Sequence, residues 1–167
     1  MSQSKAPKIH PFITYLQSKA EDRGVLAALR QGAGRPPGSI PTMYPILSPW
    51  LHDNFSAWQE DTHYLIAALF AVHPKSAAAD GDNLGDHFHQ TDPKNENQAT
   101  ERRLAILLNT HPEDLHRYLY RAITFLKSKE VAVNWHELFS DVSNWFYPDS
   151  RQQVQKKWAK GYWQKEI

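Results

Sequence analysis

The sequence predicts an all-α protein, a compact helical bundle of about six to eight helices with a proline-rich ordered connector. Two observations predict this fold class. Apolar residues recur mostly at helical spacing, and alternating apolar and polar runs are scarce. Six Trp, seven Tyr and seven Phe give the 167 residues enough large apolar side chains for a core. We expect a single helical domain over residues 1–167, with two helical subdomains split near 75–97 as the alternative.

Two short helices are expected first. One begins near Pro11, because proline suits a first helical turn. The next lies in EDRGVLAALRQGAG, where Gly32 and Gly34 end it. Residues 34–50 contain five prolines and two glycines. Because proline lacks an amide proton and clashes with a preceding helical turn, we expect an extended connector here. The apolar side chains that would hold it to the core are Met43, Tyr44, Ile46, Leu47 and Trp50.

A central buried helix is expected after the connector. Ser56 and Gln59 have the spacing of a capping box, and the following residues up to about Val72 are apolar nearly all round. The next segment, HPKSAAADGDNLGDHFHQTDPKNEN, is typical of a polar loop with room for one short helical turn.

Four helices are expected in the C-terminal half. One spans about 98–109, and the next begins at Pro112. Asn134 resembles the cap of a third helix, and Asp149 or Ser150 would cap the last. Each helix has an inward stripe at helical spacing. The stripes are Leu104, Leu107 and Leu108; Leu115, Leu119, Ala122, Ile123 and Leu126; Trp135, Leu138, Phe139, Val142 and Phe146; and Val154, Trp158 and Tyr162.

The formal net charge of +1 conceals an uneven distribution along the chain. Residues 1–35 and 151–167 each carry a net +4, and residues 101–130 carry +2. Residues 80–96 carry a net −4. Basic segments therefore surround one acidic loop, a pattern that favours an anionic partner.

Cysteine content and hydropathy exclude several classes of protein. Without cysteine the chain has no disulfide, zinc ribbon, iron–sulfur cluster or catalytic thiol, which fits a reducing compartment. The N-terminal sequence MSQSKAPKIHPF has no apolar signal-peptide core. The longest apolar run, YLIAALFAV at 64–72, is too short to cross a bilayer. We expect a cytoplasmic protein that does not contact a membrane.

Several predicted helices carry a cationic face opposite their apolar stripe. At about 100° per residue, Arg117 and Arg121 lie opposite Leu119, and Arg102 lies opposite Leu104. Such residues are often simply solvated. Here arginine dominates and few acids lie four residues away, so a polyanion would relieve the repulsion between like charges. The cations away from the stripe of the last helix are Lys156, Lys157 and Lys160.

The sequence offers little for catalysis or metal binding. Asp86, His87 and His89 contain the ligand types of a metal-dependent hydrolase, but a polar loop rich in turn formers has the same composition. DGDNLGD lacks the bidentate acid of a calcium loop, and GAGRPPG lacks the lysine of a phosphate-binding loop. No nucleophile–base pair is apparent, so we expect no catalytic residue, metal or cofactor.

Several segments in a fixed order resemble a known family. DRGVLAALRQGAGRPPGSIPTMYPILSPWL, ALFAVHP, NLGDHF, ERRLAILLNTHPEDL and VQKKWAKGYW occur in an order similar to that of the CasB family. CasB is the small subunit of the type I-E CRISPR surveillance complex, Cascade. The resemblance spans about residues 22–163. It implies an all-helical, non-enzymatic protein that forms a homodimer within the complex, beside the backbone and large subunits.

The resemblance also implies a ligand. CasB helps to hold the hybrid of guide RNA and target DNA and the displaced non-target strand, which stabilises the R-loop in antiviral defence. In the last helix many relatives have WAR where this chain has WAK, which exchanges a bidentate contact for a point charge. The alternative is a purely structural scaffold subunit without direct nucleic-acid contact. The residues expected to bind nucleic acid are Arg23, Arg30, Arg102, Arg103, Arg117, Arg121, Lys127, Lys156, Lys157 and Lys160.

Two other side chains are expected to support this basic surface. Glu101 would orient an arginine through a local ion pair. Trp163, at the border of the polar face of its helix, is the aromatic residue best placed to stack on a base, whereas core packing is expected for most other aromatic residues.

Overall fold

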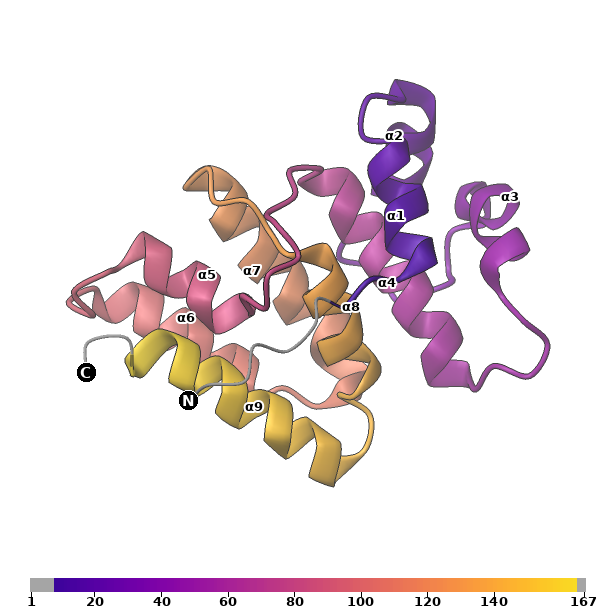
Figure 1. Cartoon of the computed structure of the whole chain (residues 1–167). Helices are drawn as coiled ribbons and strands as arrows, with labels where there is room; N and C mark the ends of the chain where they lie inside the picture. The colour runs from indigo at the N-terminus through magenta and orange to yellow at the C-terminus, as the bar shows by residue number, and fades with distance from the viewer. Residues whose placement is uncertain (1–7, 165–167) are drawn as a thin grey trace.

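The computed structural model describes residues 8–164 and confirms the all-α prediction (Figure 1). No β-strand forms in this range, where one isolated bridge joins Ser76 to Val133. Nor does any helix of the range combine the length and hydropathy that crossing a bilayer requires. The helices are α1 (Pro11–Ser18), α2 (Arg23–Arg30), α3 (Tyr44–Leu47), α4 (Ala57–Val72), α5 (Leu84–Thr91), α6 (Gln98–Leu108), α7 (Leu115–Ser128), α8 (Trp135–Ser143) and α9 (Pro148–Trp163), with the 3-10 helices η1 (Pro41–Met43), η2 (Ser48–Trp50) and η3 (Pro112–Asp114).

The proline-rich connector is partly helical, so the expectation of an extended chain is wrong. Residues 41–50 form η1, α3 and η2 in succession, each with a proline at its first or second position. A proline there loses no hydrogen bond, because the first amides of a helix have no partner within it. Met43 and Leu47 are buried as expected, but Tyr44 is 40% exposed. The other two side chains of the predicted set, Ile46 and Trp50, are half-buried against the core.

The polar segment after α4 contains a complete helix, α5, where one short turn was expected. Asn83 and Asp86 form a capping box in which each side chain accepts a hydrogen bond from the amide of the other residue. Leu84 and Phe88 are buried on the inner face of α5. These two apolar residues are too few to mark a stripe in an acidic sequence. Together with α3, this helix raises the number of α-helices in residues 8–164 to nine.

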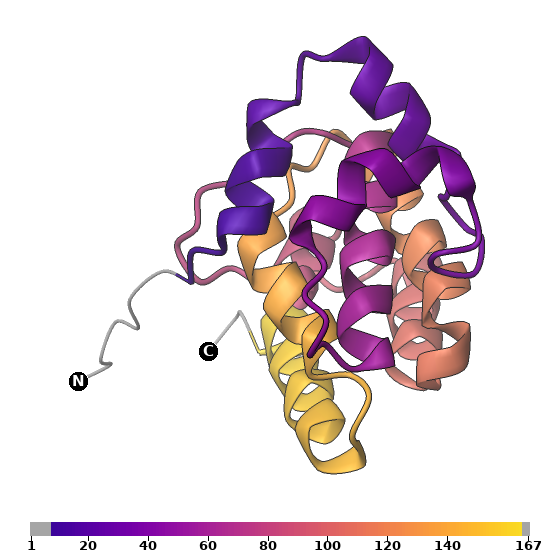
Figure 2. The same cartoon turned by 90° about the vertical axis from the view of Figure 1, so that its right-hand side faces the viewer.

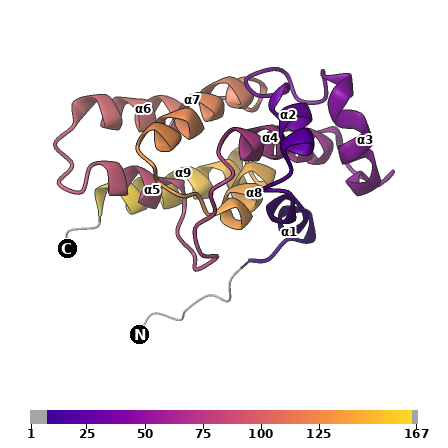
Figure 3. The same cartoon turned by 90° about the horizontal axis from the view of Figure 1, so that it is seen from above.

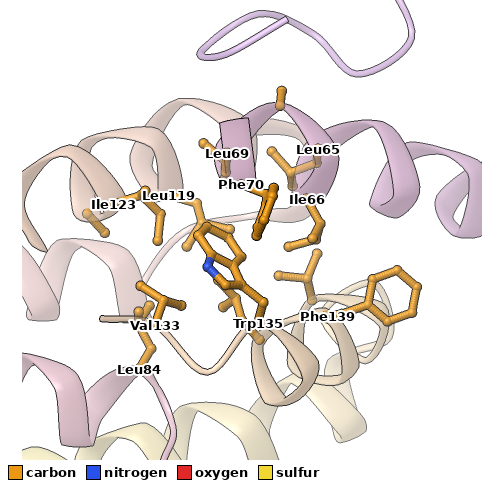
Figure 4. Close-up of a cluster of buried hydrophobic side chains, with 14 of the residues drawn as sticks. Leu65, Ile66, Leu69, Phe70, Leu84, Leu119, Ile123, Val133, Trp135 and Phe139 are labelled. Atoms are coloured by element: carbon orange, nitrogen blue, oxygen red, sulfur yellow. The ribbon is translucent and has the colours of Figure 1, made fainter. Parts of the chain in front are cut away.

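The core is built around α4 and Trp135 (Figure 4). The capping box of Ser56 and Gln59 is present, and every residue from Leu65 to Val72 is buried. Figure 4 shows Trp135 between side chains of α4 and α7, and its ring meets Phe70 edge-on with centroids 5.6 Å apart. One cluster of buried apolar residues includes members of all nine helices of the described range. A division into subdomains stays a prediction.

The stripes of α6 to α9 are buried except for Leu108, which is half-buried, and Phe146. Phe146 lies beyond the end of α8 and is 47% exposed, which corrects its predicted place in that stripe. Trp145 is buried instead, where its ring stacks on that of Trp158 with centroids 5.0 Å apart. The last helix begins at Pro148, slightly earlier than expected, because Pro148 takes its first position.

The helices are grouped at two ends of the molecule (Figures 1 and 3). α1 to α3 lie at one end, which Figure 2 views directly, and α5, α6 and α9 lie at the other. At the second end α5 and α9 cross very closely. A Cβ atom on Gly85 would lie 1.8 Å from the carbonyl oxygen of Trp158, and one on Gly161 would lie 2.8 Å from the amide nitrogen of Asp86. Glycine at both positions therefore allows the two backbones to touch.

This crossing predicts a large loss of stability in Gly85→Ala. We expect the free energy of unfolding to fall by about 3 kcal/mol, because the added methyl group overlaps backbone atoms that cannot rotate away. Gly24→Ala in α2 is the matched control. Its methyl group would meet a side-chain oxygen of Asp22 at 3.6 Å, and alanine favours a helix, so the free energy should rise by about 0.5 kcal/mol. Urea unfolding followed by circular dichroism measures both, and equal effects would contradict the close crossing.

Candidate nucleic-acid interface

Helices α6 and α7 form an antiparallel pair whose outer face carries four of the predicted arginines. The side chain of Arg103 in α6 contacts Phe125 near the end of α7, and Ile106 of α6 lies near Tyr118 in the first half of α7. The 3-10 helix η3 makes the turn between the two helices. Because the apolar stripes of both helices face inward, Arg102, Arg103, Arg117 and Arg121 are exposed.

Two adjacent hollows lie on this face and share Ile106 and Tyr118. The larger measures about 400 Å³ and has Arg102 at its edge, together with the carboxyl-bearing Asp114. The smaller measures about 120 Å³ and lies between Arg103 and Arg121. Ile106 is 47% exposed, so the floor between the guanidinium groups is apolar. We call this surface, from Arg102, Arg103, Ile106, Tyr118 and Arg121, the arginine face.

Aromatic rings hold two of these guanidinium groups in place. The guanidinium carbon of Arg103 lies 4.8 Å from the ring centroid of Phe125, and that of Arg121 lies 5.1 Å from the ring centroid of Tyr118. Stacking on a ring leaves the N–H edge of the planar group available. No carboxylate of residues 8–164 lies within 4.0 Å of the guanidinium groups of this face or of Arg117. The arginine face therefore presents positive charge that no ion pair among residues 8–164 neutralises.

Helix α9 lies beside α6 and brings two of the predicted lysines to the same end of the molecule. The side-chain amide of Gln155 donates to the carbonyl oxygen of Leu108 at 2.7 Å, and the indole of Trp163 donates to Glu101 at 3.3 Å. Glu101 therefore binds Trp163 rather than an arginine, which corrects its predicted role. Trp163 remains 37% exposed. Of the predicted lysines, Lys156 and Lys160 are exposed on α9, and Lys127 is exposed in the last turn of α7.

Lys157 is engaged inside the protein, unlike its neighbours on α9. Its ammonium donates to Glu137 Oε1 at 2.6 Å and to Asp141 Oδ1. Burial would lower the pKa of Lys157, but Asp141 and Glu137 raise it above its usual value. The indole of Trp158 donates to the second oxygen of Asp141 at 2.8 Å. This network joins α9 to α8, so Lys157 is a structural cation and leaves the set of free basic residues.

The two predicted arginines of α2 belong to a helix at the opposite end of the molecule from α6 (Figures 1 and 3). Arg23 is exposed at the start of α2. The Nε of Arg30 donates to the carbonyl oxygen of Ala71 at 3.3 Å, where α4 ends. Arg30 thus satisfies one of the last carbonyl groups of the central helix. The ten predicted residues do not form one contiguous patch.

The candidate hydrolase residues of α5 make structural contacts within the protein. His87 Nε2 accepts a hydrogen bond from the amide of Asn134 at 3.0 Å, and burial lowers the pKa of His87 to about 4. Asp86 belongs to the cap of α5, and the Nδ1 atom of His89 lies 3.3 Å from the carbonyl oxygen of Tyr162. Among residues 8–164 no three His, Cys, Asp or Glu side chains come together as metal ligands would. The metal-dependent hydrolase is the hypothesis that this geometry favours least.

Sequence reasoning missed the apolar floor of the arginine face. Ile106 belongs to no inward stripe, since it follows Arg102 and Arg103 by about one helical turn on the outer side of α6. An apolar residue on the basic side of a predicted helix was the sequence signal that could have indicated this floor. The partner residue, Tyr118, lies on the next helix, so their meeting depends on the antiparallel packing, which a single sequence does not display.

Comparisons of the sequence and fold with known proteins identify the family. Residues 25–163 match the family model described as CRISPR-associated protein Cse2. The chain belongs to the Cse2 family. A Cse2 protein of Thermus thermophilus is 26% identical over 156 residues, which cover 91% of this chain and 86% of that relative. The predicted resemblance to CasB is thereby confirmed, because solved proteins of this fold carry both names.

Solved structures have the same Cse2 fold. A chain in the structure of a CRISPR RNA-guided surveillance complex gives a TM-score of 0.75 at 25% identity and covers 90% of this chain and 88% of its own length. The crystal structure of CasB from Thermus thermophilus gives a TM-score of 0.77 at 23% identity, with 93% of this chain and 99% of that chain covered. The second likeness concerns the fold alone.

The network around Lys157 predicts that adjacent lysines of this Cse2 protein differ in their effect on stability. Lys157→Met should lower the free energy of unfolding by about 3 kcal/mol, because it leaves the buried Asp141 without a counterion and Glu137 with only Lys8, 3.7 Å away. Lys156→Met removes an exposed cation, and we expect a change within about 0.5 kcal/mol. Urea unfolding at pH 7 measures both variants. If Lys157→Met were as stable as Lys156→Met, the structural role of Lys157 would be disproved.

Proposed function

We propose that this Cse2-family chain is the non-enzymatic small subunit of a type I-E CRISPR Cascade complex. Its basic surfaces bind the hybrid of guide RNA and target DNA and the displaced non-target strand, and so stabilise the R-loop in antiviral defence. The partners are the backbone and large subunits, the two nucleic acids and a second copy of the chain. Family membership and a solved relative within an RNA-guided surveillance complex support this assignment.

The arginine face is the observation that carries the nucleic-acid part of the proposal. Arg102, Arg103 and Arg121 converge from two helices and lack a carboxylate partner among the described residues. Packing such cations side by side costs free energy unless counterions or an anionic ligand neutralise them. A sugar-phosphate backbone supplies regularly spaced anions, and its binding releases the counterions. Arginine also suits phosphate because its planar fork forms two parallel hydrogen bonds.

The composition of this face suits backbone binding more than base reading. The guanidinium groups are exposed, and the hollows between them are open and floored by Ile106 and Tyr118. Contacts to phosphate position a protein on nucleic acid but carry no sequence information. In an RNA-guided complex that division is sufficient, because base pairing reads the sequence and protein holds the backbone. We therefore propose contacts that are blind to sequence, with Arg117, Lys127, Lys156 and Lys160 adding positive charge.

The alternative is a scaffold subunit that contacts only proteins. Phe146 and Tyr147 favour it, since both are large apolar side chains exposed beyond the arginine face. Exposed aromatic residues are common at protein–protein contacts. The two functions differ in what the arginines bind, so the same substitutions separate them.

Charge reversal of the arginine face tests the proposal. In Arg102→Glu, Arg103→Glu and Arg121→Glu combined, the full chain should bind a labelled RNA–DNA hybrid at least about tenfold more weakly. The slope of log affinity against log salt should fall in magnitude by about 2 to 3, because up to three phosphate contacts are lost. Fluorescence anisotropy across a salt series measures both, and the R-loop formed by the assembled complex should dissociate sooner.

Matched variants exclude a general effect of charge. Lys94→Glu reverses an exposed cation in the acidic segment before α6 and should leave the hybrid affinity almost unchanged. Circular dichroism checks that the triple variant is folded. Unchanged hybrid affinity and R-loop lifetime, together with failed assembly of the complex, would refute the nucleic-acid contact and favour the scaffold.

A further inference from the structure

A separate hollow of about 260 Å³ shares no lining residue with the two hollows of the arginine face. Four stretches of chain that are distant in sequence form it: the proline-rich connector, α4, η3 with the first turn of α7, and the link between α8 and α9. No two of these stretches adjoin in the chain, so the hollow is a product of the tertiary fold. Its main features are the rings of Trp58 and Phe146, the carboxyl groups of Asp61 and Glu113, and the three prolines Pro36, Pro37 and Pro112.

The aromatic wall of this hollow is fixed in position. The indole nitrogen of Trp58 donates to the carbonyl oxygen of Val142 at 2.9 Å, which sets the plane of the ring. Phe146 packs beside it with ring centroids 5.7 Å apart and is still 47% exposed. Phe146 is also in contact with Tyr147, with ring centroids 5.1 Å apart, so Phe146 is held between two rings and is partly open to solvent. Flat apolar surfaces of this kind accept a planar cation on their faces.

The carboxyl groups of the hollow have no basic partner among residues 8–164. Asp61 lies one turn after Trp58 on α4, and neither Asp61 nor Glu113 has a lysine or arginine nitrogen within 4.0 Å in that range. Burial and the neighbouring Glu60 raise the pKa of the Asp61 carboxyl. His116 also lines the hollow, but burial lowers its pKa, so the imidazole adds no positive charge at neutral pH. Arg35 and Arg117 are exposed and adjoin Pro36 and His116 of the hollow in the chain, but among residues 8–164 neither forms an ion pair with its carboxyl groups. The hollow thus contains two carboxyl groups without a paired cation.

We propose that this hollow binds an arginine side chain presented by a different protein chain. A guanidinium group can stack on Trp58 or Phe146 while its N–H edge meets Asp61 and Glu113. The same carboxylates repel phosphate, which excludes nucleic acid as the occupant. A neutral side chain would fill the space but leave both carboxylates without a partner.

The choice of a different chain over a second copy rests on the proposed function. The arginines that this chain displays on α6 and α7 are the ones assigned to phosphate. A copy that inserted one of them into the hollow would remove it from the nucleic-acid face. Arg30 and Arg151 already donate to backbone carbonyl groups. Arg35 directly precedes Pro36 of the hollow, so a second copy could insert it only by bringing two acidic hollows together. A neighbouring subunit can supply an arginine without that conflict, so the hollow and the arginine face serve two partners at once.

A titration of the full-length, ¹⁵N-labelled chain tests the chemistry of the hollow. The probe is the blocked tripeptide Gly-Arg-Gly, and the reporter is the indole N–H resonance of Trp58, identified by its loss in Trp58→Phe. We expect a saturable shift with half-saturation at about 1 to 10 mM, as suits one contact in isolation. The blocked tripeptide Gly-citrulline-Gly has nearly the same shape without the charge and should give no saturable shift.

Two aspartate variants sharpen the titration. Asp61→Asn should weaken arginine binding at least about tenfold, since it removes a charged hydrogen bond. Asp53→Asn makes the same substitution at an exposed site outside the hollow and should bind as the unaltered chain does. Equal shifts with both peptides, no saturable shift with arginine, or full binding by Asp61→Asn would each overturn the proposal. Because no nucleic acid is present, failure of the proposed function leaves this result readable.

The source of the arginine is tested in the assembled complex. Phe146→p-benzoylphenylalanine keeps an aromatic ring at the mouth of the hollow and crosslinks to neighbouring atoms under ultraviolet light. Mass spectrometry should find the crosslink on a peptide of a different subunit that contains arginine. A crosslink to nucleic acid or to a second copy of this chain would contradict the assignment.

Discussion

The guanidinium groups of the arginine face lack carboxylate partners in the described protein, and the proposed function depends on that lack. Arg102, Arg103 and Arg121 come from two antiparallel helices, so their repulsion is built into the packing of α6 on α7. The inward stripes hold the helices together and leave the arginines no alternative position. A ligand with regularly spaced negative charge relieves this repulsion, and a rigid helix pair binds it without prior rearrangement.

Several acidic side chains of the described residues have roles in the fold. Glu137 and Asp141 bind Lys157 between α8 and α9, Glu101 binds the indole of Trp163, and Asp86 caps α5. Carboxylates engaged in the fold cannot neutralise the arginine face. In the hollow beside Trp58 the charges are reversed, because Asp61 and Glu113 have no paired cation among residues 8–164. Opposite charges exposed on different surfaces suit a subunit that holds an anionic polymer on one side and a protein neighbour on another.

Local sequence signals predicted most of the helices correctly, but they predicted the arrangement of the site residues less well. Apolar spacing predicted α4 and α7, and caps such as Ser56 were correct, because short-range geometry decides these features. The connector was predicted to be extended, but its prolines occupy first or second helical positions and so permit short helices. Helix α5 was predicted to be mostly loop, because only two apolar residues, Leu84 and Phe88, mark its buried face. The separation of Arg30 from Arg102 and the capture of Lys157 depend on tertiary packing. The identity of the nucleic-acid ligand was predicted from the resemblance to CasB, because the spacing of the basic residues indicated only an anionic partner.

The most direct measurement is photocrosslinking from the floor of the arginine face. Ile106→p-benzoylphenylalanine places the crosslinker between the guanidinium groups, and Tyr44→p-benzoylphenylalanine places one at an exposed aromatic position at the other end of the molecule. In the assembled complex with a bound R-loop, position 106 should crosslink to nucleic acid, and position 44 should not. Crosslinks from position 106 to protein only, or equal crosslinking of nucleic acid from both positions, would contradict the account.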